Sequence, residues 1–346
     1  MPAVAGTKGE VIASTTRQYV LRRALGAGTF GCVWKGSSDR QEKVAIKLCP
    51  SNGNRKRDQN LLKEFGLGQR ASNLLRSHGL TPEVVECFLL DRSRGRESGL
   101  FYVTVMEYLD GVDATDLVAG IAALGKALSL PEVALIVADV TRGLDYLHSA
   151  TPSFLHRDLK ADNLMVSREG RVCLCDFGLS RSLYAGEVAT SEVGTPLAMA
   201  PEVGVKRPYG TAADIWSLGV LAHHVAVGRM PLTVQDIRSL QDIKRFHLSI
   251  QREGCFRPAP GTPPAVAEFV SSCMTFVPEL RGTAAELLHF PLLAHRADSA
   301  LVRPQLARSV QAVLEARKRN KPGADESYVE PQRRGAGAPG APGAPG

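Results

Sequence analysis

The chain has 346 residues, of which 44% are hydrophobic and 22% are charged, so it can bury a core large enough to divide into two. Its formal net charge of +7 favours acidic partners in general. Basic clusters occur at 55–57, 92–96, 317–321 and 333–334, but none is interleaved with aromatic residues. This pattern leaves solvated surface or a docking patch, and it argues against a DNA or RNA partner.

The seven cysteines are odd in number and fall mostly inside hydrophobic runs, a pattern typical of reduced core thiols in an intracellular protein. Residues 1–16 lack the basic start and apolar core of a signal peptide. No stretch reaches the roughly 18 uninterrupted apolar residues of a membrane span. We therefore expect a soluble, cytoplasmic protein without a membrane span; a nuclear location stays open.

In chain order, residues 1–16 are expected to form a flexible leader, and short apolar runs at 19–25, 32–36 and 43–48 predict strands around a glycine turn. Residues 58–76 have helical spacing, and 84–90 and 100–107 again resemble strands. Beyond Asp110 and Gly111 the pattern becomes helical, with 131–149 the clearest stretch and 263–275 and 283–294 weaker. The expected fold is α+β, with a small β-rich N-terminal lobe and a larger helical C-terminal lobe that meet near 107–111.

The last part of the chain predicts an appendage to this fold. Residues 297–320 form an expected helical extension, in which helical spacing runs from Pro304 to Asn320 with the proline in the first turn. The Gly, Ala and Pro repeat within 321–346 cannot bury apolar area, so we expect this tail to be disordered.

A glycine-rich turn joins the first two predicted strands, so its N–H groups can approach phosphate oxygens closely. By itself this pattern also fits a tight hairpin or a dinucleotide-binding loop, but the helix that a dinucleotide fold requires does not follow it. The residues of this turn are Leu25, Gly26, Ala27, Gly28, Thr29, Phe30 and Gly31.

Lys47 ends an apolar strand, where an ammonium group needs a counter-charge. Glu64 is the expected partner because it is the acidic residue at the centre of the helix predicted over 58–76. Gly66 and Gly68 each cost that helix about 1 kcal/mol. We therefore expect a mobile helix, with the pairing of Lys47 and Glu64 dependent on activation or on a partner.

The most informative segment runs from His156 to Asn163 and is followed thirteen residues later by Asp176, Phe177 and Gly178. Phosphoryl transfer needs a carboxylate that orients the accepting hydroxyl, a cation for the moving phosphate, and oxygen ligands for Mg²⁺. Asp158 and Lys160 meet the first two needs. Asn163 and Asp176 offer the oxygen ligands that Mg²⁺ prefers.

These motifs, in this order over about 17–296, resemble those of the eukaryotic-type protein kinases. The resemblance implies ATP and Mg²⁺ as cofactors, with Lys47 on the α- and β-phosphates. It also implies an adenine site at the backbone of Glu107 to Leu109, with Met106 behind the base and Asp113 at the ribose hydroxyls or at a basic substrate side chain. The apolar residues expected to enclose the base, each of which also fits plain core, are Val33, Ala45 and Met165.

The resemblance further implies serine/threonine specificity, because Lys160 lies two residues after Asp158, and Thr195 and Pro196 precede an Ala-Pro-Glu segment. Ala198 departs from the family, which usually has an aromatic residue there, and this puts the shape of the substrate-docking surface in question. Asp214 and Arg281 stand where the family has structural residues.

Phosphorylation at Thr190 or Ser191 is expected to order the activation segment through Arg157. The alternative is that these two residues are ordinary loop hydroxyls.

We conclude that the sequence predicts a serine/threonine protein kinase with protein substrates and an upstream kinase as a further partner. The main alternative is a pseudokinase scaffold that binds nucleotide without transfer. A small-molecule phosphotransferase is disfavoured by the Ala-Pro-Glu segment.

Overall fold

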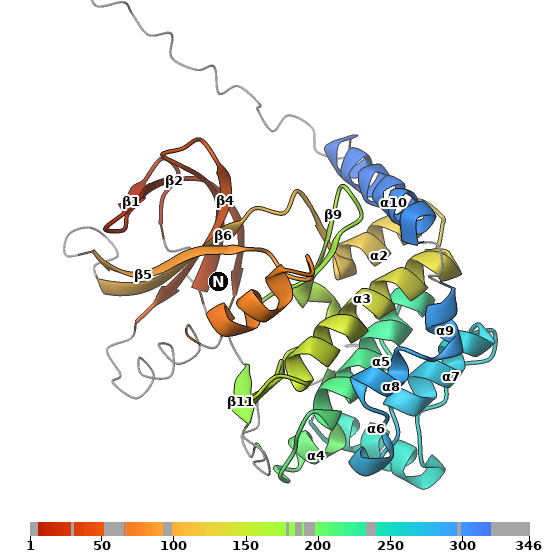
Figure 1. The fold of residues 1–346 in the computed structure, drawn as a ribbon. Coiled ribbons are helices and arrows are strands. Elements are labelled where there is room, and N and C mark those ends of the chain that lie inside the picture. Colours follow the sequence, from red (N-terminus) through yellow and green to blue (C-terminus); the bar gives the residue numbers. More distant parts are fainter. Residues whose placement is uncertain are drawn as a thin grey trace, which may run out of the picture.

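The computed structural model describes residues 6–28, 31–51, 66, 68–92, 99–177, 180–183, 189, 198–232, 240–295 and 299–319. Strands dominate the first third of the chain and helices the rest, as predicted (Figure 1). Two large apolar clusters underlie this division, one within the N-terminal sheet and one among the helices.

The N-terminal sheet has six antiparallel strands in the order β1-β2-β3-β4-β6-β5. Side chains alternate between buried and partly exposed along β3, because successive residues of a strand point to opposite faces. The apolar face covers a core that includes Tyr19, Leu21, Ile46 and Val103. The strands are β1 (Val11–Ala13), β2 (Gln18–Gly28), β3 (Gly31–Ser38), β4 (Lys43–Pro50), β5 (Val84–Arg92) and β6 (Gly99–Glu107).

All five strands predicted in this region are confirmed. The flexible leader is wrong for residues 11–13, which form β1 and pair with β2; Ile12 is buried in the sheet core, which explains the pairing. Of the helix predicted over 58–76, residues 66 and 68–76 are described and helical. Glu64 lies outside the described residues.

The helical part is built around α3, which has buried residues along most of its length. Ser129 and Glu132 form a reciprocal capping box at its start. The helices of this part are α2 (Ala114–Ala123), α3 (Leu130–His148), α4 (Pro201–Gly204), α5 (Ala212–Val227), α6 (Leu240–Glu253), α7 (Pro264–Cys273), α8 (Ala284–Leu287), α9 (Pro291–Ala294) and α10 (Ser299–Arg319), with short 3₁₀ helices η1 (Ala161–Asn163) and η3 (Pro278–Leu280).

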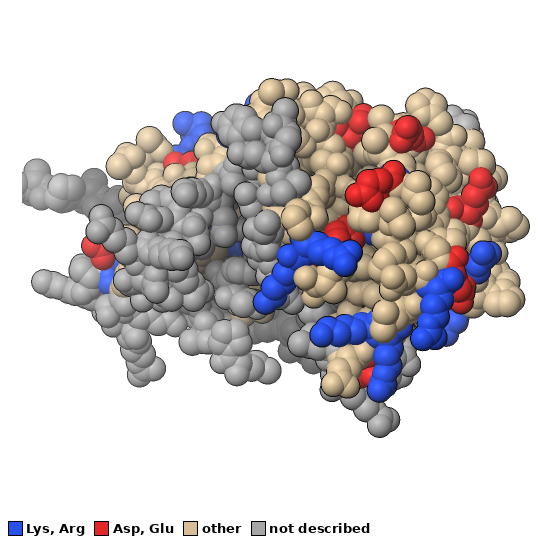
Figure 2. Space-filling view, turned by 90° about the horizontal axis from the view of Figure 1, so that it is seen from below, with Lys and Arg blue, Asp and Glu red and all other residues tan. Residues whose placement is uncertain are grey.

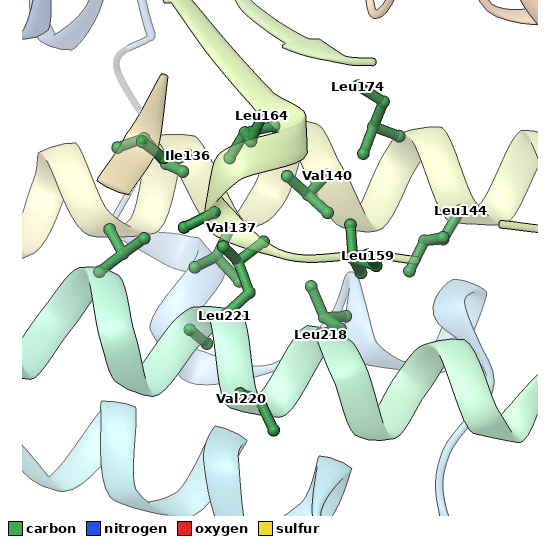
Figure 3. Close-up of a cluster of buried hydrophobic side chains, with 14 of the residues drawn as sticks. Ile136, Val137, Val140, Leu144, Leu159, Leu164, Leu174, Leu218, Val220 and Leu221 are labelled. Carbon is green, nitrogen blue, oxygen red and sulfur yellow. The ribbon is translucent and has the colours of Figure 1, made fainter. Parts of the chain in front are cut away.

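The core between α3 and α5 anchors the loop that carries the candidate catalytic residues. Val137 of α3 and Leu221 of α5 lie between the two helices, and Leu159 of the loop packs beside Leu218 (Figure 3). Leu159 is 1% exposed, so the residue that follows Asp158 is fixed in the core. Short strands complete the surroundings: β7 (Gly111–Asp113), β9 (Leu164–Ser167) and β10 (Val172–Leu174) form one small sheet, and β8 (Ser153–Leu155) pairs with β11 (Arg181–Leu183).

Two helical predictions need correction. The stretch 283–294 is two short helices, α8 and α9, because Pro291 disfavours helical backbone at Phe290, whose ψ of 147° is extended. The extension begins at Ser299, so Pro304 lies inside α10 and not in its first turn. Val302, which is 7% exposed, lies before the proline and gains burial from the earlier start.

Charge is distributed unevenly on the helical part. On the face seen from below, Lys and Arg side chains gather toward one edge, and Asp and Glu side chains are spread over the rest (Figure 2). Within the part of the chain that the structure describes, none of the helices is both long enough and apolar enough to cross a bilayer.

Candidate active site

A cavity of about 700 Å³ opens between the N-terminal sheet and the helical part. Strands β2, β3, β4 and β6 line one side, and β9, η1 and the start of α2 line the other. It brings together most of the residues predicted to bind ATP and Mg²⁺: Leu25, Gly26, Val33, Ala45, Lys47, Met106, Glu107, Leu109, Asp113, Asn163, Met165 and Asp176.

Strand register explains why these residues converge. Ala45 lies opposite Met106, and Lys47 lies opposite both Val33 and Thr104. Residues two apart share a face of a strand, so Ala45 and Lys47 face the cavity together. From the other side, β9 contributes Met165.

The glycine turn has two different structural roles. Gly31 has φ +138°, and a Cβ there would lie 2.1 Å from the Leu48 carbonyl oxygen, so this position needs glycine for β3 to approach β4. Among the described residues, none lies within 4 Å of a Cβ on Gly26, and Gly26 lines the cavity. Thr29 and Phe30, at the tip of the turn, lie outside the described residues.

Lys47 forms an ion pair with Asp176, with 2.5 Å between Nζ and Oδ1. Asp176 has φ +60°, a left-handed conformation that an Asp adopts more readily than most residues. The counter-charge that the sequence required for Lys47 is therefore present, although the described partner is Asp176 and the predicted pairing with Glu64 is not described.

Asp158, Lys160 and Asn163 form one hydrogen-bonded group. The Lys160 ammonium donates to Asp158 Oδ2 at 2.9 Å. Asn163 Nδ2 donates to the same oxygen at 2.9 Å and to the Asp158 carbonyl at 2.8 Å. These bonds hold the carboxylate in one orientation beside a cation.

Asp214 of α5 holds the backbone on the other side of this group. Its carboxylate accepts hydrogen bonds from the amides of His156 at 2.8 Å and Arg157 at 2.9 Å. These bonds stabilise the left-handed φ of +66° at Arg157. Burial opposes ionisation of Asp214, yet these donors and His148 Nε2, at 2.9 Å, hold its pKa below the ordinary value.

His156 is part of the packed interior beside the Asp158 loop. Its ring is fully buried, and burial lowers its pKa, so it stays neutral. The ring lies 5.2 Å from that of Phe177, which ties the catalytic loop to the segment that carries Asp176.

Asn163 and Asp176 fit a divalent cation by the chemistry of their donors. The amide N–H of Cys175, which precedes Asp176, donates to the Asn163 carbonyl at 2.9 Å, so the two candidate ligands are held close together. Among the described residues, no three His, Cys, Asp or Glu side chains converge on a common metal position. A cation here would therefore need further oxygens, which the phosphates of a nucleotide supply.

At the junction with the helical part, Asp113 caps α2 by accepting from the Asp116 amide at 2.7 Å. Burial, together with the charges of Asp116 and Asp162, raises the pKa of Asp113 to about 6.

Glu107 is held by Arg171, with 2.7 Å between Nη2 and Oε2. Cys175 also lines the cavity, and burial raises the pKa of its thiol, which disfavours a reactive thiolate.

Beyond the cavity, Glu202 and Arg281 form a buried bidentate pair at 2.7 and 2.9 Å, in agreement with the structural role expected for Arg281. Ala198 is buried, and beside it and the Asp158 loop lies a cavity of about 20 Å³, so part of the room that a larger side chain would fill is empty. The predicted regulatory residues Thr190, Ser191 and Thr195 lie outside the described residues.

The structure adds residues that sequence reasoning did not find. His148 supports Asp214, and the partly exposed side chains of Asp116 and Arg317 line the cavity. His148 had one signal, its place at the end of a clear helix. Arg317 had only its place in the basic cluster 317–321, which does not connect the last helix with the site.

Comparison with known families tests the resemblance directly. The family model described as "Protein kinase domain" matches residues 19–293, well over half of the chain. The chain belongs to the protein kinase family. The match ends before α10, so this helix of the kinase lies outside the matched domain.

Proposed function

We propose that this kinase transfers the γ-phosphate of ATP to serine and threonine hydroxyls of protein substrates, in a two-lobed fold with the nucleotide between the lobes. One observation carries the proposal. Lys47, Asn163 and Asp176 line one nucleotide-sized cavity, and Asn163 donates to the Asp158 carboxylate that also accepts from Lys160, so base, phosphate cations and metal ligands all come from this chain.

Each group has a defined task in this proposal. Asp158 orients the acceptor hydroxyl and takes its proton. Lys160 stabilises charge on the phosphoryl group in flight, and Lys47 holds the α- and β-phosphates. A bound Mg²⁺ on Asn163 and Asp176 would neutralise phosphate charge.

Serine/threonine specificity is supported by Lys160 and by the Thr195-Pro196 pair. The position of Lys160, 2.9 Å from Asp158, places its ammonium beside the proton acceptor. We also propose regulation by an upstream kinase that phosphorylates Thr190 or Ser191, with Arg157 receiving the phosphate. An intracellular, cytoplasmic location belongs to the same proposal.

The second candidate function is a pseudokinase scaffold. Gly68 favours it, because a Cβ there would meet, among the described residues, only Phe177, at 3.7 Å. The helix of residues 68–76 thus has little side-chain contact with the described part of the Asp176 segment at this point. The catalytic group described above favours the active enzyme.

The test is phosphate transfer from Mg-ATP by purified kinase to itself and to generic serine/threonine and tyrosine substrates. Transfer to serine and threonine that disappears in Asp158→Asn establishes the enzyme. No transfer, even after treatment with an upstream kinase, combined with nucleotide binding that raises the melting temperature, would favour the scaffold.

A further inference from the structure

Helix α10 is an integral part of the fold, although it lies outside the family match. It runs alongside α2 and α3 (Figure 1) and also contacts β7 and β9. Its apolar stripe is buried against them, with Leu306 and Val310 at 0% exposed. Burial of this extent fixes the helix in one position, as in any core element.

Polar contacts anchor the first half of α10 to α3. Arg303 pairs with the buried Asp139 at 2.8 Å, and Ser309 donates to Glu132 at 2.6 Å. A Cβ on Gly170, which has φ +76°, would lie 2.4 Å from the Arg303 carbonyl oxygen, so the two backbones are in close contact. These contacts set the position of the helix along its axis.

Close packing against α2 positions the second half. Gly120 of α2 gives room to Val313, because a Cβ at Gly120 would lie 2.5 Å from Val313 Cγ1. One turn further along, residue 317 lies on the same face of the helix. The position of Arg317 is therefore set by packing that begins at Val302.

Arg317 reaches the mouth of the nucleotide cavity. Its Nη2 lies 2.5 Å from Asp116 Oδ1, and both residues line the cavity together with Asp113. Their side chains are 44% and 43% exposed, and an ion pair this exposed contributes little to stability. A guanidinium has five N–H donors in a fixed fork, so a single contact with Asp116 can orient the group and leave donors for a ligand.

We propose that Arg317 is a nucleotide-binding residue supplied by the C-terminal helix, held by Asp116 on the ribose side of the site. The inference rests on the proposed binding of ATP. It has an electrostatic reason as well. Asp113, Asp116 and Asp162 all line the cavity, and the charges of Asp116 and Asp162 act on Asp113, so a negatively charged nucleotide beside these carboxylates would be repelled without a nearby cation. Asp116 acts as a positioning residue.

The test is calorimetric titration of the full chain with the Mg²⁺ complex of the non-hydrolysable ATP analogue adenylyl imidodiphosphate. We expect Arg317→Ala to raise Kd about tenfold, the size of one lost charge-assisted hydrogen bond. Arg317→Lys should give an intermediate Kd, and Asp116→Asn a rise smaller than that of Arg317→Ala. Arg319→Ala is the matched control, since Arg319 is exposed in the same final turn, and should leave Kd unchanged.

Two results would overturn the inference while the proposed function stands. The first is wild-type affinity in Arg317→Ala. The second is tighter binding in Asp116→Asn together with wild-type affinity in the double variant Asp116→Asn/Arg317→Ala, which would mean that Arg317 only neutralises the charge of Asp116. A wild-type chain that binds no nucleotide would overturn both the inference and the proposed function. Unchanged melting temperatures of the variants without ligand establish that a higher Kd reflects the site and not the fold.

Discussion

At the scale of the residue, Asp113 combines two roles that oppose each other. Its carboxylate caps α2 and lines the cavity, while burial raises its pKa to about 6. A carboxyl group whose pKa is higher in the folded chain than in the unfolded chain is favoured in its protonated form. Its contribution to stability is therefore present at low pH and is lost as the pH rises through about 6.

This dependence of stability on pH gives a prediction for Asp113→Asn, in which the neutral amide keeps the oxygen that caps α2. We expect the variant to be more stable than the wild type at pH 8, with the difference shrinking as the pH falls below about 6, because the wild-type carboxyl then becomes neutral as well. Melting curves of both proteins from pH 4.5 to 8 measure it. If the difference in stability between the two proteins does not vary with pH, the raised pKa of Asp113 is contradicted.

Gly68 is a second residue whose effect on stability can be measured. It lies in the described helix of residues 68–76, and a Cβ there would make an ordinary 3.7 Å contact with Phe177. We expect Gly68→Ala to raise the free energy of unfolding by about 1 kcal/mol. Urea unfolding tests this, with Gly79→Ala as the contrasting control: Gly79 has φ +66°, so that variant should lose stability. If both variants gain stability, or if both lose it, the explanation from backbone conformation is refuted.

At the scale of the element, α2 and α10 approach each other closely at Gly120 and Val313. Gly120→Ala adds a methyl group 2.5 Å from Val313 Cγ1, so we expect overpacking to outweigh the gain in helix propensity and to destabilise the protein by about 1–3 kcal/mol. Val313→Ala should destabilise it by leaving a cavity.

The double variant Gly120→Ala/Val313→Ala tests whether the two residues act through one another. The added methyl group then fills part of the space that Val313 leaves, so the loss of stability should be smaller than the sum of the two single losses by about 0.5–3 kcal/mol. Urea unfolding of all three variants gives this coupling energy. Additive losses would mean that the packing at Gly120 does not position α10.

At the scale of the whole molecule, Glu202 and Arg281 connect parts of the chain that are far apart in sequence. Arg281 also donates to the carbonyls of Thr275 at 2.7 Å and Ala212 at 2.9 Å, so one buried guanidinium joins α4, the start of α5 and the segment after α7. Arg281→Ala leaves the Glu202 charge buried without its cation, and we expect a loss of about 3–5 kcal/mol.

The matched control for Arg281→Ala is Arg245→Ala. Arg245 pairs with Asp242 at 3.2 Å, but its side chain is 76% exposed, so the loss should be about 0–1 kcal/mol. Denaturant unfolding of both variants compares them. Similar losses in the free energy of unfolding would show that the buried pair does not stabilise the fold more than the exposed pair does.

Local sequence was sufficient for much of this protein. Short apolar runs predicted the five main strands of the sheet, and the spacing from His156 to Asp176 predicted the candidate catalytic group, because these residues lie close together in the chain and their chemistry restricts what they can do. The helix predicted over 131–149 is α3, Leu130–His148, and it could be predicted for the same reason, since its periodicity is long and regular.

Tertiary structure decided what depends on contacts between distant segments. The pairing of β1, the start of α10 at Ser299 and the support of Asp214 by His148 all rest on burial against residues far away in the chain. Arg317 is the clearest case. Its own sequence shows only a basic helix end, and the packing of Val313 against Gly120 brings it to the cavity between the sheet and the helices. Sequence determined the chemistry of the site, because short-range order and residue type are enough for it, whereas packing determined which distant residues complete it.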